Sequence, residues 1–255
     1  MNAFLPWVVC VLFGVPFGLY RTHHVVMHHV EDNAAGRDLS STEPYQRDSL
    51  PHFLVYWARH AIAAWVELPW YCVRTRRYKL AAATVGGMAG FWMVVAAMHR
   101  VNPVGAAWVL VIPFFFSSFL IMFGNWSQHV FVSPSGPRDA YCNSYNCLYC
   151  PDNCLTYNDG YHILHHLNSR LHWSQMPQQF VKTMREHAER DALSFSGIGF
   201  FDVGLAVFTG RLAWLADHVV PMGKLQAARS REEWEDVLRE RLRPVTVATP
   251  ARKTG

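Results

Sequence analysis

Charged side chains are scarce in this sequence of 255 residues, where they make up 16% of the chain. An average soluble domain has roughly 25%, so the deficit argues against an ordinary cytosolic globule and against intrinsic disorder. It also excludes a coiled coil, which would be rich in Glu and Lys. The net charge of +4 is too small to indicate a nucleic-acid-binding protein. The first six residues contain no Lys or Arg, so the basic start of a signal peptide is also missing.

Long uncharged runs are what the chain has instead, and 51% of its residues are hydrophobic. Residues 80–98 and 101–124 carry no charge, and about 20 apolar residues are needed to cross a membrane. Because only His99 and Arg100 separate the two runs, we expect a transmembrane helical hairpin. A buried helix pair in a soluble protein is the alternative, but a chain of this length could not easily cover both helices. Residues 3–20 are uncharged but contain prolines and glycines, which predicts a short span or a re-entrant segment.

Composition also predicts the segments around the hairpin. Residues 52–72 are apolar but contain charged side chains, so we expect them to lie in the membrane interface. Residues 195–222 predict a pair of surface helices that touch lipid, and residues 229–243 predict a helix with Glu and Arg at helical spacing. The last ten residues are expected to fray. The predicted fold is all-α and membrane-integral, with a membrane domain over residues 1–192 and with interfacial helices and a polar tail over residues 193–255.

Basic side chains predict the orientation of the hairpin. Arg100 is the basic residue at its tip, whereas eight Lys and Arg residues lie between the first apolar run and the hairpin. These eight are Arg21, Arg37, Arg47, Arg59, Arg74, Arg76, Arg77 and Lys79. Because basic residues favour the cytosolic side of a membrane, we expect both ends of the hairpin to lie in the cytosol.

Histidines are unusually clustered in this chain. One cluster consists of His23, His24, His28 and His29, the other consists of His162, His165 and His166, and His129 stands four residues after Asn125. On an α-helix, His24 and His28 would share a face, one turn apart. Protonated imidazoles so close together would repel one another, so a metal cation that holds them neutral explains the clusters better than surface histidines without a ligand role. Neutral imidazole suits iron, zinc or copper.

The hairpin predicts that the two clusters meet. A hairpin returns the chain to the side that it left, so both clusters fall on the cytosolic face, provided that residues 52–72 do not span the membrane. His129, at the exit of the hairpin, joins them there. A structural zinc takes four ligands, so this many imidazoles fits two metal ions better. Four further histidines, His52, His99, His187 and His218, are predicted to lie at the surface.

The order of these motifs resembles that of the membrane-bound fatty acid desaturases. In that family three histidine boxes hold two iron ions on the cytosolic side of a helical membrane domain, and the resemblance implies the same here over roughly residues 20–180. By this resemblance His24, His28 and His29 match the second box, Asn125 and His129 match the ligand pair at the end of the last span, and His162, His165 and His166 match the third box. The Asp159-Gly160-Tyr161 sequence before the third box is also similar to the family pattern.

The chain departs from the family pattern at the first box. The family places an H-x3-4-H motif before the second box, but none of the 22 residues before His23 is a histidine. We therefore expect either an upstream segment that carries this motif, within about 20–40 residues before Met1 given the length of a spanning helix, or a substitute ligand. With an upstream segment, residues 1–255 alone should fail to desaturate lipid in yeast, whereas turnover by this chain alone would favour a substitute ligand. His23 and His60 are the local candidates for a substitute. His172 is a further possible ligand or a capping residue, and Asp159 is either an imidazole partner or a turn residue.

Four cysteines form a separate motif. Cys142, Cys147, Cys150 and Cys154 follow the spacing C-x4-C-x2-C-x3-C, which is similar to that of metal-thiolate sites. They predict either a second metal site, holding zinc or an iron–sulfur cluster, or a set of reduced thiols in a cytosolic loop, where disulfides are disfavoured.

The family resemblance implies an enzyme that desaturates the acyl chain of a lipid or acyl-CoA, with two Fe ions as cofactor and O2 as co-substrate. It also implies the membrane of the endoplasmic reticulum as location and cytochrome b5 as electron donor, or ferredoxin in a plastid. The basic residues Arg74, Arg76, Arg77 and Lys79 are candidates for docking such a donor, although anchoring to the membrane surface is the preferred interpretation. A hydroxylase on the same scaffold and a catalytically silent, N-terminally truncated fragment are the alternatives.

Overall fold

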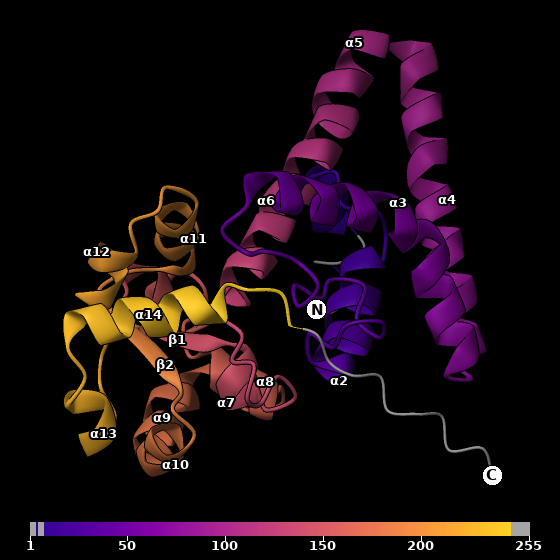
Figure 1. Cartoon of the computed structure of the whole chain (residues 1–255). Helices are drawn as coiled ribbons and strands as arrows, with labels where there is room; N and C mark the ends of the chain where they lie inside the picture. Colours follow the sequence, from indigo (N-terminus) through magenta and orange to yellow (C-terminus); the bar gives the residue numbers. More distant parts are fainter. Residues whose placement is uncertain (1–3, 5–7, 246–255) are drawn as a thin grey trace.

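Two long helical arms form a hairpin that projects from the rest of the molecule (Figure 1). In the computed structural model, which describes residue 4 and residues 8–245, the first arm is α4 (Tyr78–Val101). The second arm runs through α5 (Pro103–Ala106), η3 (Ala107–Val111) and α6 (Ile112–Gln128). By length and composition both arms could cross a membrane. The helices predicted over residues 80–98 and 101–124 are therefore confirmed.

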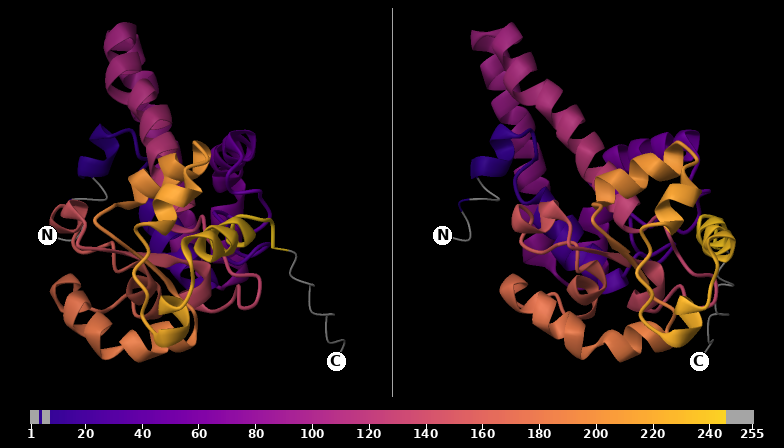
Figure 2. Two further views of the ribbon diagram at one scale, coloured as in Figure 1. Left: turned by 60° about the vertical axis from the view of Figure 1, so that its left-hand side comes forward. Right: turned by 90° about the vertical axis from the view of Figure 1, so that its left-hand side faces the viewer.

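The hairpin turns at a capped junction. The Asn102 side chain accepts a hydrogen bond of 2.9 Å from the Gly105 amide, and Pro103 occupies the start of the second arm, where no amide donor is needed. His99 and Arg100 are exposed beside this turn. Figures 1 and 2 show that the tip lies at the opposite end of the molecule from the C-terminal half.

Helix α3 (Leu50–Arg74) precedes the hairpin and packs against α4. Ser49 caps its first turn by accepting a hydrogen bond from the His52 amide. Ile62, Val66 and Trp70, spaced by four residues, are exposed along one side of the helix. An apolar outer face of this kind is what an interfacial helix requires, and residues 52–72 were predicted to form one.

The N-terminal apolar run does not form one continuous helix over its described residues. It contains the three-residue helix α1 (Cys10–Leu12), followed by a bend in which Gly14 and Gly18 have φ angles of 75° and 70°. A Cβ on Gly14 would lie 2.1 Å from the Phe114 amide nitrogen, so the bend presses directly against the second arm. Residues 1–3 and 5–7 of the predicted segment lie outside the described residues.

A two-stranded parallel sheet corrects the all-α prediction. Strand β1 (Tyr145–Leu148) pairs with β2 (Leu193–Ser196), and Tyr145 lies opposite Leu193. Each strand has only four residues, and both are almost fully buried, so neither shows the polar–apolar alternation that reveals a strand in a sequence. The pairing also joins the predicted membrane domain to the segment that follows residue 192.

Short helices make up most of the C-terminal half. They are α7 (Ala140–Asn143), η4 (Pro151–Cys154), α8 (His162–Leu167), η5 (Trp173–Gln175), α9 (Met176–Lys182), α10 (Met184–Glu189), α11 (Phe200–Phe208), α12 (Leu212–Ala216), α13 (Lys224–Ala227) and α14 (Arg231–Arg241). Residues 195–222 thus contain the predicted pair of helices, but they begin with a strand. The helix predicted over residues 229–243 is α14, which Ser230 and Glu233 cap reciprocally. Residues 246–255, predicted to fray, lie outside the described residues.

A buried arginine ties the loop between α2 (His29–Glu31) and α3 to the end of α14. The Arg47 side chain has no exposed surface, and its guanidinium donates to the carbonyl oxygens of Val130, Arg241 and Arg243 at 2.9, 2.8 and 2.5 Å. Its own amide donates to the Leu242 carbonyl at 2.9 Å. These bonds fix the loop beneath the end of α6, where the histidines converge.

Candidate metal centre

Three histidines of the first cluster lie on a π-helix, η2 (Arg21–His28), and His29 follows at the start of α2, which corrects the predicted pairing of the side chains. The His29 amide donates to the His24 carbonyl, so residues five apart lie above one another. As a result, His24 stands beside His29, with their Nε2 atoms 3.2 Å apart. His28 turns instead toward His129, with ring centroids at 5.0 Å. An α-helix would have stacked His24 on His28.

The histidines converge in two groups of three, and the ligand atoms within each group lie within 4.8 Å of one another. The inner group is His28, His129 and His166, and the outer group is His24, His29 and His165. The groups adjoin, since the His29 and His166 rings have centroids 5.2 Å apart. His162 contacts the inner group, with its Nε2 atom 3.2 Å from that of His166. The structure therefore brings both sequence clusters and His129 to one place.

An oxygen atom lies beside the Nδ1 atom of each histidine of the inner group and of His162. The pairs are His28 with Asp38 at 2.6 Å, His129 with the Asn143 carbonyl at 2.9 Å, His166 with Asp32 at 2.8 Å, and His162 with Asp159 at 3.2 Å. Metal-binding histidines commonly use one nitrogen in this way, which fixes the ring and leaves Nε2 for the metal. Asp159 is therefore an imidazole partner.

The Nε2 atoms of His28 and His129 are buried and have no hydrogen-bond partner. A buried polar atom without a partner costs about 1–3 kcal/mol, and such atoms are rare in folded proteins unless water or an ion satisfies them. Two of them pointing into one all-imidazole group fit a transition-metal cation, because imidazole is a good ligand for iron, zinc and copper.

Four histidines of the two groups have a lowered pKa and are held neutral by their surroundings. Burial lowers the pKa of His129 and His166 well below the usual value for histidine. Burial and the neighbouring imidazoles lower the pKa of His29 to about 3 and that of His165 to about 4. Metal ions bind the neutral imidazole, so these four side chains are ready to bind a metal at neutral pH.

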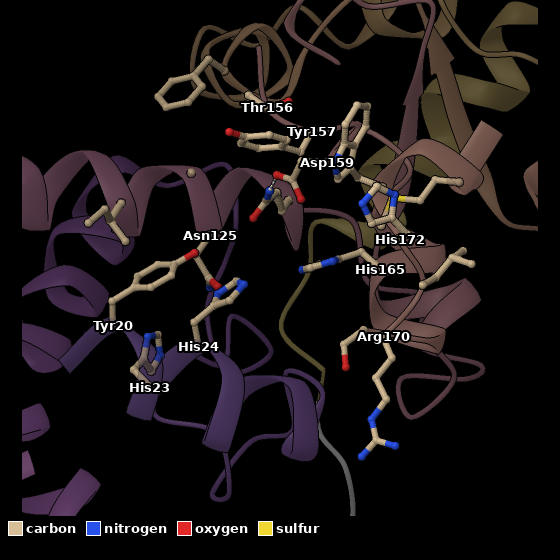
Figure 3. A pocket seen from close by; sticks show the side chains of 18 of the residues that line it. Tyr20, His23, His24, Asn125, Thr156, Tyr157, Asp159, His165, Arg170 and His172 are labelled. Atoms are coloured by element: carbon tan, nitrogen blue, oxygen red, sulfur yellow. Dashed lines mark hydrogen bonds between the residues drawn. The ribbon is translucent and has the colours of Figure 1, made fainter. Parts of the chain in front are cut away.

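A cavity of about 750 Å³ opens beside the outer group. Figure 3 shows His23, His24 and Asn125 on one side of it and His165 and His172 on the other. A second, largely apolar pocket of about 50 Å³ shares Tyr20, His23 and Ile121 with this cavity and continues between the N-terminal run, α3 and α6. The outer group thus stands at the edge of a space that narrows and becomes apolar.

Two predicted ligands line the cavity without joining either group of three. Asn125 donates through Nδ2 to the Tyr56 hydroxyl at 2.7 Å and to the Ser40 carbonyl at 3.2 Å. His172 is exposed, and its Nδ1 atom lies 2.8 Å from the Ser174 hydroxyl at the start of η5. His172 therefore acts as a helix cap in this structure.

Other histidines considered in the sequence lie outside the two groups of three. His23 and His60 contact each other but join neither group. His187, predicted to lie at the surface, is fully buried between the rings of Tyr141 and Phe180, and that prediction is wrong. An isolated histidine in a polar sequence gave no sign of this aromatic pocket, which long-range packing creates.

The four cysteines are not gathered into a metal site. Within residues 142–154, all of which the structure describes, no thiol belongs to a group of three ligand atoms. Cys147 and Cys150 are part of the hydrophobic core around β1, whereas Cys154 is exposed.

Sequence reasoning missed the carboxylates of Asp32 and Asp38. Both lie on the loop that follows the first cluster, at no regular spacing from the histidines they contact. Asp32 and Asn33 have φ angles of 50° and 59°, and the Asn33 side chain accepts a hydrogen bond from the Thr42 amide at 2.8 Å. Asp and Asn adopt the left-handed conformation more often than other non-glycine residues. The adjacent Asp32 and Asn33 are therefore a weak sequence signal that could have drawn attention to this loop.

Comparison with known proteins adds one finding. A family model described as fatty acid desaturase matches residues 1–198. No curated protein and no solved structure matches the chain. The matched range contains every histidine of both groups and ends just after β2.

Proposed function

Because the chain belongs to the fatty acid desaturase family, we propose that it is an oxidoreductase that desaturates the acyl chain of a lipid or acyl-CoA with two Fe ions and O2. The observation that carries the proposal is the pair of adjoining three-imidazole groups, of which the outer one lies at the edge of a cavity. A single metal ion would leave one of these groups of ligands without a metal. Bound iron would supply the activation of O2 that no side chain can provide.

The residues that would hold the metals follow from the two groups. His28, His129, His166 and His162 would hold one iron ion, and His24, His29 and His165 would hold the other. Asn125 faces the cavity beside the outer group and is the remaining candidate ligand. Asp38 and Asp159 orient the rings of His28 and His162 through Nδ1, and Asp32 lies 2.8 Å from the Nδ1 atom of His166. Tyr20 stacks on His24 with ring centroids 5.0 Å apart and holds that ring in place.

The acyl chain would lie in the cavity beside the outer group. Leu120, Ile121 and Phe201 give that cavity apolar walls, and the narrow pocket beyond Tyr20 would extend them. An apolar wall excludes water and holds a flexible chain close to the metals, which raises the rate by proximity.

The hairpin would anchor the enzyme in the membrane, with the apolar face of α3 in the interface and α11 touching lipid through Phe201 and Leu205. Basic residues before the hairpin would place the metal centre on the cytosolic side, by the positive-inside rule. We propose the endoplasmic reticulum as its location, residues 1–192 as its membrane domain and residues 193–255 as its interfacial part. Electrons would come from cytochrome b5, or from ferredoxin in a plastid. The basic turn around Arg76 would anchor the protein to the membrane surface.

Expression of the chain in yeast tests this function. Wild-type protein is expected to carry at least two iron ions per chain and to convert host acyl chains into products that have lost two hydrogens, measured by metal analysis and by mass spectrometry of lipids. His165→Ala should lose both properties, whereas His99→Ala, at the exposed hairpin tip, should keep them. An active His165→Ala protein or an iron-free wild type would refute the proposal, and products that gain oxygen would identify a hydroxylase instead.

A further inference from the structure

His23 and His60 form a third pair of buried imidazoles outside the two groups. His23 lies on η2 and His60 on α3, and their ring centroids are 4.7 Å apart with the rings inclined at 67°. Their exposed fractions are only 5% and 8%. Two polar rings, from helices in different parts of the chain, are thus buried in contact with each other.

Three of the four ring nitrogens of this pair have no hydrogen-bond partner among the described residues. His23 Nε2 and both ring nitrogens of His60 are buried without a hydrogen bond in the structure. Whichever nitrogen of His60 carries its proton, the other one keeps a free lone pair. The Nε2 atoms of His28 and His129 in the inner group show the same property, and water or an ion usually explains it.

The π-helix places the pair next to the inner group but separate from it. His23 precedes His28 by five residues, so both lie on the same side of η2, with ring centroids 6.1 Å apart. His28 meets His129 and His166, whereas His23 meets His60. The nitrogens of His23 and His60 belong to neither three-imidazole group, which indicates a binding position of their own.

A pocket and a negative charge lie at this position. The narrow pocket of about 50 Å³ is lined by both His23 and His60, which is room for an ion with water, since a single water needs roughly 10–15 Å³. Burial lowers the pKa of both imidazoles, and the nearby carboxylate of Asp38 opposes that lowering in each. The same carboxylate would favour a cation between the rings.

We propose that His23 and His60 bind a transition-metal cation of the iron–zinc class, in addition to the two ions of the three-imidazole groups. Imidazole nitrogens select such ions over Ca²⁺ and Mg²⁺, which prefer oxygen ligands. Water in the pocket completes the coordination. The proposal does not depend on the reaction that the enzyme catalyses.

Metal stoichiometry of the full chain tests this site. The protein is purified in detergent, stripped with a chelator, reloaded with Co²⁺ and washed, and the bound cobalt is counted by elemental analysis and by its visible absorption. Wild type should bind three ions per chain. His60→Gln should bind two, and His99→Gln, the matched control, should bind three. His129→Gln reports separately on the inner group.

Each outcome decides the proposal. A His60→Gln protein that binds as many ions as wild type overturns it, because only water would then lie between the rings. If His60→Gln does not fold, His23→Gln on the opposite wall must show the same loss of one ion. Loss of an ion in His129→Gln but not in these variants would refute this site while keeping the proposed function.

Discussion

At the scale of single residues, the inner metal group depends on side chains that do not themselves reach the metal position. Asp38 is buried, and the pKa of its carboxyl is held low because its contacts with His28 and with the Ser40 amide outweigh the effect of burial. It therefore stays ionised and keeps the proton of His28 on Nδ1. Which nitrogen faces the group is thus decided by a carboxylate ten residues away in sequence.

Replacing this carboxylate should weaken metal binding. Asp38→Asn keeps the size of the side chain but removes the charge that fixes the His28 ring, and loss of such a partner typically costs about 10–100-fold in metal affinity. Competition with a chelator of known affinity measures the effect. Asp48→Asn, on the exposed part of the same loop, is the control, and equal affinities of the two variants would contradict the role of Asp38.

His187 predicts a pH dependence of stability outside the metal centre. Burial lowers its pKa in the folded protein below the usual 6.5, so the unfolded chain binds more protons than the folded one below that pH. Stability should therefore fall as the pH drops through 6.5 and be fully present above it.

The prediction is checked by thermal unfolding of wild type and His187→Gln at pH 7.5 and pH 5.5. Wild type should lose more stability than the variant over this interval, because glutamine does not titrate. The comparison isolates His187 from the other buried histidines, which both proteins retain. An identical loss in the two proteins would show that His187 does not contribute.

At the scale of secondary-structure elements, close packing of backbones holds the N-terminal run against the hairpin. A Cβ on Gly87 of α4 would lie 2.2 Å from the Phe17 carbonyl oxygen, whereas a Cβ on the adjacent Gly86 would meet nothing within 4 Å. The two glycines are neighbours in one helix but face different surroundings. They therefore form a matched pair for testing this contact.

Gly87→Ala should destabilise the protein, because a backbone carbonyl cannot yield as a flexible side chain can, and overpacking of this kind costs about 1–3 kcal/mol. Gly86→Ala should be neutral or stabilising, since alanine favours the helix. The melting temperatures of the two purified variants give the comparison. Equal melting temperatures would mean that the N-terminal run does not press on α4.

At the scale of the whole molecule, the hairpin tip and the C-terminal half lie at opposite ends (Figure 2). The native thiol of Cys154 is exposed in the C-terminal half, and Cys142, Cys147 and Cys150 are buried. A membrane-impermeant maleimide should therefore report on one side through Cys154 and on the other through Arg100→Cys.

In sealed vesicles the two thiols are expected to react from opposite sides, because a hairpin that spans the membrane separates its tip from its ends. Cys154→Ser provides the background of the other native cysteines. Reaction of both thiols from the same side in intact vesicles would mean that the hairpin does not cross the membrane.

The sequence by itself determined the hairpin, the two histidine clusters and their meeting at His129. Long uncharged runs and dense clusters are local properties, and a hairpin needs no information beyond the lengths of its arms. The family followed from the order of these motifs.

Only the tertiary structure decided which histidines share a group. Spacing cannot distinguish an α-helix from a π-helix, and the hydrogen bond from His29 to His24 regroups the first cluster. Contacts between distant segments placed Asp32 beside His166, His60 beside His23, and β1 beside β2. The same packing leaves the four thiols outside any group of three ligand atoms in the described part of the chain. Such contacts depend on how the whole chain packs, because no local pattern records which side chains will meet across the fold.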